Sequence, residues 1–591
     1  MKINREADIV IVGAGIVGLF NALMYAKQGL QVVIIDNVVN QKRSYKVGES
    51  LLSYSNVFLR TLGELDSFAN TSYTKLGVWF TNGMEWKKSF EDNTEWALSY
   101  QDSWFKEIMP NTLQYRACFH EKQLVRPEAE DFMQERVRSY SNVTFLDTAL
   151  VDDVLIGDGE EPHEVKWICR ETKESGSVAA RWVIDCGGRR RLIATKMGHA
   201  TDFGDDFQTT AVWAQFGNVL EEQFDDIWAY TYENGTRSMR QKHTCHLWGD
   251  GYWIWVIRLS NNRLSVGVTF DQNKQPAGAK PKDQFWDVMN RYPILTSLLK
   301  KEDMLEFRMY KDVQYTTDTF VSEKRYGMAG DAATIIDAYY SQGISMSLLT
   351  SFHIGNIVYE DVRQGRLNRE YIDRVNRNLT QDWLIIRNFV LTKYTKAIED
   401  HRFFILSHLL DNVILSSGIQ LRWYFVRWML NTNGDPAKES KLDAKLRTIL
   451  QKKLFHSQAS WSFASPEKIR SLQGYLQRKM GERARWRVEN GVMTPHLKLL
   501  WPPLPKLSKL PFVGKKKLVN LTGKQISGKA AKLFIPKPET IVHRPFTAAV
   551  FVMLFQFFWA YGYDAFSTGK NKLLAAIGVG KSEKEQHRSH I

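Results

Sequence analysis

The pattern of hydrophobic and polar positions begins with a strand–turn–helix–strand unit at the start of the chain. Asp8–Val12 reads as an apolar strand and leads directly into the turn Gly13-Ala14-Gly15-Ile16-Val17-Gly18. An apolar-periodic helix follows, and a second strand ends on Asp36. Glycines let the backbone turn tightly and approach a pyrophosphate at a helix N-terminus, while the acid accepts from a ribose hydroxyl. The pattern therefore predicts a dinucleotide site at Gly13, Gly15, Gly18 and Asp36.

Three later segments repeat the pattern of an apolar run that ends in small residues. Trp182–Gly188 is a strand that closes on a glycine turn, and Arg325–Gly330 is a strand followed by an acid. Ser341–Ser345 opens a helix, whose N-terminal amides favour an anion or a reduced flavin. The chain has one Gly-x-Gly-x-x-Gly fingerprint of this kind, which favours FAD over a built-in pyridine-nucleotide domain. The further cofactor-binding candidates are Gly48, Asp185, Gly187, Gly330, Asp331, Gly343 and Ile344.

These elements predict an α/β chain, α+β overall. A Rossmann-like parallel sheet should bind FAD, with an antiparallel sheet inserted into it that covers the flavin ring and the substrate. The expected divisions are residues 1–200 and 321–365 for the FAD domain, 201–320 for the antiparallel substrate sheet, 366–430 for a helical cap and 431–591 for a C-terminal extension.

Charge divides the chain unequally. Residues 436–591 carry 29 Lys and Arg against 9 Asp and Glu, a net charge of +20, whereas residues 1–435 carry 50 against 56, a net charge of −6. The four cysteines lack zinc-site spacing, so no metal is expected, and they are typical of a reducing, cytoplasmic chain. A basic tail of this kind favours nucleic acid, an anionic membrane or an acidic partner.

The composition of the tail separates these partners. Lysines alternate with apolar residues through Trp501–Pro538, and Phe546–Tyr563 is eighteen residues without a charge. Such a segment could span a bilayer, lie in its interface or pack as a buried helix on the enzyme body. Nucleic acid is not expected, because no recognition helix, RNA platform or zinc pattern accompanies the charge. We expect peripheral or anchored contact with the inner face of an anionic membrane, and the buried helix remains the alternative.

Four motifs make the chain resemble the flavin-dependent halogenases. Val47-Gly48-Glu49-Ser50 resembles the Gly-Glu-Ser branch, which acts on phenols, pyrroles and carrier-tethered substrates. Tyr73–Phe80 is similar to the family segment that holds a catalytic lysine, and Lys75 is the matching position. Trp253–Ile257 resembles the family's Trp-x-Trp-x-Ile signature, and Leu124–Glu128 resembles its Arg-Pro-Glu segment. The resemblance covers roughly residues 5 to 360.

The resemblance implies a two-component reaction of secondary metabolism. A separate flavin reductase supplies reduced FAD, and oxygen and halide then give hypohalous acid, which Lys75 delivers to an electron-rich small-molecule or carrier-tethered substrate. An amine can hydrogen-bond hypohalous acid or attack it, and Glu49 can handle the proton. Trp253 and Trp255 would line the substrate pocket. Ser341, Gln342 and Gly343 would hold the halide.

Two positions depart from the family pattern. Arg258 stands where the family has a proline after Trp-x-Trp-x-Ile, and Gln342 stands where the family has a serine or threonine beside the halide. Two alternatives therefore stay open. The chain could be an FAD-dependent monooxygenase or dehydrogenase that acts on a hydrophobic substrate, or a peripheral membrane flavoprotein with a binding role.

Overall fold

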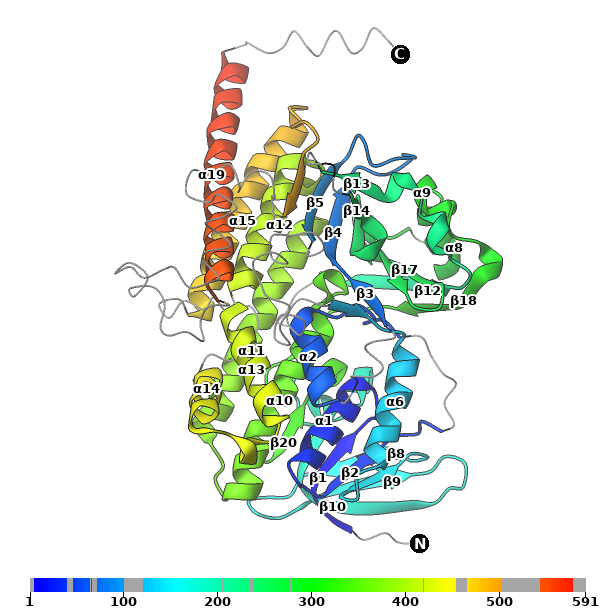
Figure 1. Ribbon diagram of the computed structural model, residues 1–591, viewed down its shortest axis with the longest axis vertical. Coiled ribbons are helices and arrows are strands. Elements are labelled where there is room, and N and C mark those ends of the chain that lie inside the picture. Colours follow the sequence, from blue (N-terminus) through cyan, green and yellow to red (C-terminus); the bar gives the residue numbers. More distant parts are fainter. Residues whose placement is uncertain are drawn as a thin grey trace.

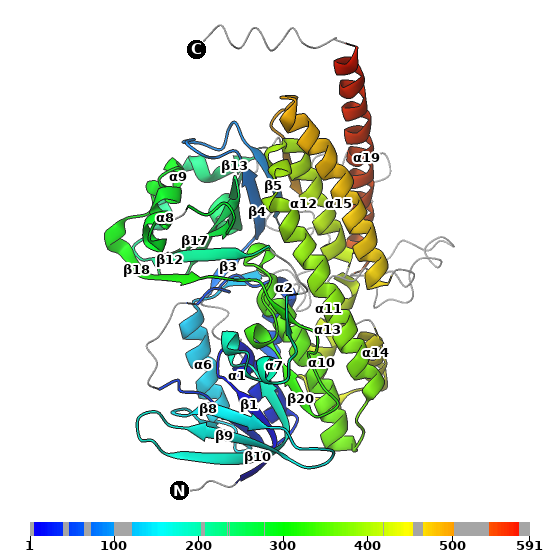
Figure 2. The same ribbon diagram turned by 180° about the vertical axis from the view of Figure 1, so that it is seen from behind.

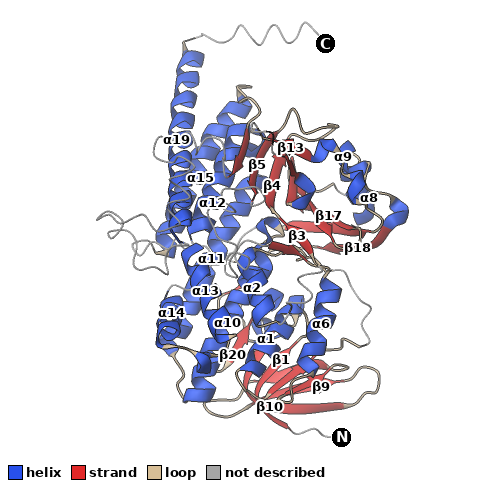
Figure 3. Cartoon of the chain, viewed as in Figure 1, coloured by secondary structure: helices blue, strands red, loops and turns tan. Residues whose placement is uncertain are grey.

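Two sheets and a tall layer of helices make up the computed structural model (Figure 1). The structure describes residues 5–39, 46–63, 65, 72–99, 121–202, 207–232, 235, 237–276, 278–417, 419–452, 465–501 and 543–577. One sheet lies near the N-terminus and the other lies above it in the view of Figure 1. A tall layer of helices flanks both sheets on one side, and the helices labelled α8 and α9 lie on the far side of the second sheet (Figure 3).

The first sheet carries the predicted nucleotide unit. Its strand order is β7-β2-β1-β10-β9-β8, with β20 also paired to β10. Strands β7, β2, β1, β10 and β20 run parallel, and β9 and β8 return as antiparallel neighbours. The bounds are β1 Arg5–Val12, β2 Val32–Ile35, β7 Val143–Leu146, β8 Leu150–Leu155, β9 His163–Ile168, β10 Ser175–Asp185 and β20 Tyr326–Met328. Helices α1 (Ile16–Lys27), α6 (Arg126–Arg138) and α7 (Leu192–Lys196) belong to this part of the chain.

The second sheet has the order β18-β12-β17-β16-β15-β4-β5-β21. Most of its strands are buried along their whole length, because one face turns toward the first sheet and helices α8 (Pro281–Met289) and α9 (Pro293–Thr296) pack in the core of the other face. The bounds are β4 Gly77–Asn82, β5 Thr94–Ser99, β12 Thr209–Phe216, β15 Thr244–Gly249, β16 Tyr252–Leu259, β17 Arg263–Asp271, β18 Met304–Tyr310 and β21 Lys498–Trp501. Short strand pairs complete the β-structure: β3 Tyr73–Lys75 with β6 Glu121–Gln123, β11 Ala200–Thr201 with β19 Thr316–Thr317, and β13 Ala229–Thr231 with β14 Arg237–Met239.

The predicted fold class is confirmed, but the second sheet recruits strands from beyond the interval 201–320. Strand β4 pairs in parallel with β15 at the register Thr244↔Val78, and β5 and β21 extend that edge. Sequence periodicity identifies a strand but does not say which sheet it joins, because pairing is a long-range choice. The domain boundaries expected from the sequence stay a prediction, with these three strands as the observed exceptions.

Helices fill the third layer (Figures 1 and 2). Their bounds are α2 Ser53–Thr61, α10 Gln342–Gln364, α11 Arg369–Leu391, α12 His401–Ser417, α13 Ile419–Thr432, α14 Lys441–Lys452, α15 Pro466–Glu489 and α19 His543–Ala576. Helix α12 is buried along nearly its whole length, between β5 on one side and α15 and α19 on the other.

The C-terminal extension is joined to the body. Strand β21 adds to the second sheet, α15 packs on α11 and α12, and α19 packs on α12 and α15. Both views place α19 on the outside of the helical layer (Figures 1 and 2). Within the described ranges, none of the helices is long and apolar enough to cross a membrane.

Candidate functional site

A cavity of about 570 Å³ lies between the two sheets, and the glycine turn after β1 forms one of its ends. Gly13 has a φ of 93°, and a Cβ there would come within 2.6 Å of the Cys186 carbonyl oxygen. A Cβ on Gly18 would come within 2.0 Å of the Gly13 oxygen, so Gly18 allows helix α1 to pack closely and does not line the cavity. A Cβ on Gly15 would meet nothing within 4 Å, which leaves this part of the turn open toward the cavity. The turn therefore fits a pyrophosphate at the N-terminus of α1.

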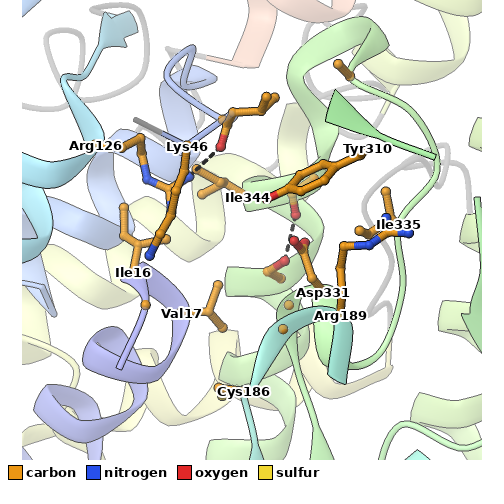
Figure 4. A pocket seen from close by; sticks show the side chains of 18 of the residues that line it. Ile16, Val17, Lys46, Arg126, Cys186, Arg189, Tyr310, Asp331, Ile335 and Ile344 are labelled. Carbon is orange, nitrogen blue, oxygen red and sulfur yellow. Dashed lines mark hydrogen bonds between the residues drawn. The ribbon is translucent and has the colours of Figure 1, made fainter. Parts of the chain in front are cut away.

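Acidic and basic side chains frame this end of the cavity. The Asp36 carboxylate lines it and accepts from the Ala14 backbone amide at 2.7 Å. Arg126 donates to the Val47 carbonyl at 2.8 Å and pairs with Glu130 at 2.7 Å, and Lys46 pairs with the same Glu130 at 2.9 Å. Figure 4 places Arg126 and Lys46 on one side of the pocket and Arg189 on the other. The positive charge of these lysine and arginine side chains suits the two phosphates of FAD.

Of the cofactor-binding residues predicted at the end of β10 and in the loop after it, one lines the cavity and one does not. Asp185 is buried, and its carboxylate accepts from the backbone amides of Gly187 at 2.8 Å and Ile193 at 2.9 Å. It therefore shapes the loop from behind and is not among the lining residues, whereas Gly187 is. Gly330 and Asp331 also line the cavity, and Asp331 lies on the side opposite Arg126 in Figure 4.

The Gly-Glu-Ser segment joins the two sheets. The Gln215 amide on β12 donates to the Glu49 carboxylate at 2.9 Å, and the Ser50 and Thr244 hydroxyls are 2.8 Å apart. Gly48, Glu49 and Ser50 all line the cavity. Burial raises the pKa of Glu49, although the bond from Gln215 opposes this. A buried carboxyl of raised pKa at the floor of a cavity can hold or pass a proton.

Alternating residues of the second sheet form the roof. Thr244 and His246 on β15 and Trp255 and Ile257 on β16 line the cavity, but Trp253 does not. The Trp255 indole lies across Gly267, where a Cβ would be 2.1 Å from the ring. Trp253 instead contacts Tyr339, with ring centroids 5.2 Å apart. Burial lowers the pKa of His246 to about 3, which leaves its imidazole neutral.

Arg258 points away from the cavity, since it alternates with Ile257 along β16. Its guanidinium donates to the Val219 carbonyl and lies 3.7 Å from the Glu221 carboxylate. This departure from the family pattern therefore leaves the cavity wall unchanged.

The turn before α10 is left-handed at two consecutive non-glycine residues. Tyr340 has a φ of 64° and Ser341 a φ of 55°. The Tyr340 hydroxyl donates to Asp411 at 2.8 Å, and Asp411 also accepts from Lys393 at 2.6 Å, so helix α12 holds this turn in place. Ser341, Gly343 and Ile344 line the cavity, while Gln342 is buried outside the lining.

Asp337 also lines the cavity, and sequence patterns did not single it out. Its carboxylate accepts from the Tyr339 amide at 3.0 Å and the Tyr394 hydroxyl at 3.2 Å. Burial raises its pKa to about 7. The sequence feature that could have identified Asp337 is an acid four residues before Ser341, where the helix N-terminus predicted to bind an anion begins.

Lys75 lies behind the cavity wall. Its ammonium is fully buried, 2.9 Å from the Glu121 carboxylate and 3.3 Å from the Leu51 carbonyl. Leu51 follows Ser50, and the Ser50–Thr244 pair forms the nearby wall. Lys75 itself is not among the described residues that line the cavity. The Lys75 ammonium therefore lies beside the cavity, and the cavity wall separates the two.

The family model described as "FAD binding domain" matches residues 6–374, more than half of the chain. The chain belongs to this FAD-binding family. The prediction of FAD is thereby confirmed, and the glycine turn, Asp36 and the surrounding cations are the residues that fit it.

Known proteins are similar to this chain over part of its length. The chain is 25% identical over 371 residues to flavin-dependent halogenase chlA of Dictyostelium discoideum, which covers 58% of each chain. The chain thus spans little more than half of that relative. Its fold resembles halogenase PltM in complex with phloroglucinol and FAD, with a TM-score of 0.63, 19% identity and coverage of 82% of this chain and 92% of that one. It also resembles a flavoprotein/dehydrogenase from Cytophaga hutchinsonii, with a TM-score of 0.54, 16% identity and coverage of 76% and 99%. These likenesses establish the fold.

Proposed function

We propose that this chain is a flavin-dependent halogenase of an electron-rich small molecule. Its halogenase-named relatives and the buried Lys75 beside the FAD cavity support this. The single observation that carries the proposal is the Lys75–Glu121 pair, since a desolvated amine one side-chain layer from the flavin cavity has little structural reason to be there. An ion pair buried in this way costs desolvation energy that apolar residues would avoid.

The proposal gives each group of residues a role. FAD held in this cavity and reduced by a separate flavin reductase would supply the activated oxygen needed to oxidise halide. The backbone amides at Ser341–Gly343 would hold the halide at the N-terminus of α10. Lys75 would orient hypohalous acid as an ammonium, or, once Glu121 has taken its proton, would attack the halogen as the neutral amine to give a haloamine and release water. Glu49 would take the proton that the substrate releases.

Halogen transfer requires the wall between Lys75 and the cavity to open. Ser50 and Thr244 are joined by one hydroxyl hydrogen bond, and the Gln123 amide donates to Thr244 at 3.3 Å. Neutral hydrogen bonds of this kind contribute about 0.5–1.5 kcal/mol each, so thermal motion can break them. We therefore assign Ser50 and Thr244 the role of a gate.

The test is the halide dependence of turnover. The full chain would be supplied with FAD, a flavin reductase, oxygen, bromide and phloroglucinol as an electron-rich phenol. We expect a brominated product whose rate rises with bromide concentration. Turnover that is independent of halide, with an unhalogenated product, would overturn the proposal.

A second candidate is FAD-dependent monooxygenation or dehydrogenation. It is favoured by the closed position of Lys75, because direct oxygen transfer inside the cavity needs no amine. Labelled oxygen and the mass of the product together separate these activities. An oxygenase incorporates the label, a dehydrogenase gives an unlabelled product two hydrogens lighter, and a halogenase gives an unlabelled product that contains halogen.

The proposal also covers partners and location. We assign the chain a cytoplasmic flavin reductase as its partner, a free or carrier-tethered substrate within secondary metabolism, and contact with an anionic membrane through the basic extension. The +20 charge of residues 436–591 supports the last of these.

A further inference from the structure

One side of helix α19 packs on the body, and the opposite side carries exposed apolar residues. Met553 and Phe557 are buried, and Asp564 and Thr568 continue the same face. These positions recur every four to seven residues, which places them along one side of the helix. This side meets α12 and α15.

A buried ion network fixes the packed face. Arg487 on α15 donates to Asp564 at 2.7 Å, to Thr568 at 2.6 Å and to Asp400 at 2.7 Å. Arg483 adds a second contact to Asp564 at 2.5 Å. Because Arg487, Asp400 and Asp564 are all essentially buried, the rotation of α19 about its axis is specified.

The opposite face of α19 carries large apolar side chains that remain exposed. Trp559 and Phe566 are each 73% exposed. The other large apolar or aromatic residues of this bare face are also more than half exposed: Phe555, Phe558, Tyr563, Leu573 and Ile577. The stripe from Phe555 to Ile577 is about 33 Å long at the helical rise. Apolar side chains at this density normally mark an interaction surface.

Charge identifies the occupant. Lys570 is exposed on the bare face between Phe566 and Leu573. Residues 502–542, just before the helix, hold nine lysines against one glutamate in sequence. Aromatic and aliphatic side chains beside lysines suit the boundary between acyl chains and anionic headgroups. Two copies of the chain would instead bring two strongly basic extensions together, which repel.

We propose that the bare face of α19 docks on the surface of an anionic lipid bilayer, with the helix axis in the bilayer plane. Phe555, Trp559 and Phe566 enter the acyl boundary, and Lys570 beside them meets a headgroup phosphate. The docking surface rests on one part of the proposed function, the contact with an anionic membrane. It does not depend on halogenation, so a negative result in the halide test would leave the docking proposal intact.

The experiment is co-sedimentation of the full chain with vesicles. Vesicles of phosphatidylcholine with phosphatidylglycerol are compared with phosphatidylcholine alone, at low and high salt. We expect binding to the anionic vesicles that weakens with salt. The variant Trp559→Ser/Phe566→Ser should bind at least about tenfold more weakly, because two large apolar groups no longer enter the bilayer.

A matched variant controls for general loss of surface apolarity. Trp86→Ser/Leu305→Ser removes two exposed apolar side chains outside the helical layer and should bind vesicles like the parent chain. Equal binding of the Trp559/Phe566 variant would overturn the proposal. So would a drop in its melting temperature without a change in vesicle binding, which would mean that the chain itself covers the face. A parent that sediments as a dimer, while the variant is monomeric and neither binds vesicles, would assign the face to self-association.

Discussion

Lys75 and Glu121 face each other across the antiparallel strands β3 and β6, with the ammonium and the carboxylate 2.9 Å apart. Both side chains are essentially buried. In the neighbouring pair of the same ladder, Thr74 is exposed and Lys122 is half-buried, and the lysine donates to the threonine hydroxyl at 3.1 Å. One ladder therefore provides a fully buried lysine and a half-buried one for comparison.

Breaking the buried pair should destabilise the chain strongly. Lys75→Met removes the ammonium that lies 2.9 Å from the buried Glu121 carboxylate, at a cost of about 3–5 kcal/mol in the free energy of unfolding. The double variant Lys75→Met/Glu121→Gln should regain much of this loss, because no net charge stays buried. Denaturant unfolding of the single and double variants measures the coupling, with Lys122→Met as the control that changes stability by less than about 0.5 kcal/mol. Additive losses would mean that the two groups do not interact.

Gly267 should not tolerate a side chain. A Cβ there would lie 2.1 Å from the Trp255 ring, so Gly267→Ala must displace the indole from the cavity roof. We expect a loss of about 1–3 kcal/mol in stability and weaker FAD retention. Gly474→Ala on α15 is the control, since nothing lies within 4 Å of its Cβ, and it should leave FAD binding unchanged. Calorimetry and the FAD absorbance of the purified protein read out both effects.

Asp337 should make stability fall as the pH rises toward neutrality. Burial raises its pKa in the folded chain to about 7, above the roughly 3.9 of an unfolded aspartate. Between these values the folded state holds the proton and the unfolded state does not, so its contribution is present at low pH and is lost as the pH rises to about 7. The slope from this group is at most about 1.4 kcal/mol per pH unit.

Asp337→Asn provides the matched comparison for that slope. The amide does not titrate, so the variant should gain stability relative to the parent as the pH increases from about 5 to about 7. Melting temperatures of both chains across this interval measure the difference. Parallel curves would show that Asp337 does not hold a proton in the folded state.

The network at Arg487 should control the docking of α19. Arg487→Met removes the arginine that bridges the buried Asp400 and Asp564, and Asp564 keeps its contact with Arg483. We expect a loss of about 3–5 kcal/mol in the free energy of unfolding, mainly from Asp400. Amide hydrogen exchange should accelerate most in α19. Arg478→Met changes an exposed arginine of the same helix and should leave exchange in α19 as it was.

Local patterns predicted the parts of the site that are built from consecutive residues. Gly13, Gly15 and Asp36 belong to a strand–turn–helix motif in which the glycines and the acid stand at fixed spacings. Asp185 also lies at the end of a strand before a glycine turn, yet its carboxylate accepts hydrogen bonds from the backbone amides of Gly187 and Ile193. A pattern identifies an acid beside a turn but does not say which way its side chain points.

Long-range partners were not predictable in this way. Arg126 binds the Val47 carbonyl, and Gln215 binds Glu49 across 166 positions of sequence. Lys75 is separated from the cavity because it pairs with Glu121 and because the Ser50 and Thr244 hydroxyls are in contact. These residues come from separate segments of the sequence. Each depends on the packing of the two sheets, which local periodicity does not encode.

Mass spectrometry of the product formed with bromide, reduced FAD, oxygen and phloroglucinol, in the parent chain and in Lys75→Met, decides whether Lys75 delivers the halogen. We expect the twin isotope peaks of bromine in the parent product and a loss of about 100-fold or more in Lys75→Met, while the variant still oxidises reduced flavin and Lys122→Met brominates normally. Equal bromination by Lys75→Met, or a parent product that contains added oxygen and no halogen, would contradict this role of Lys75.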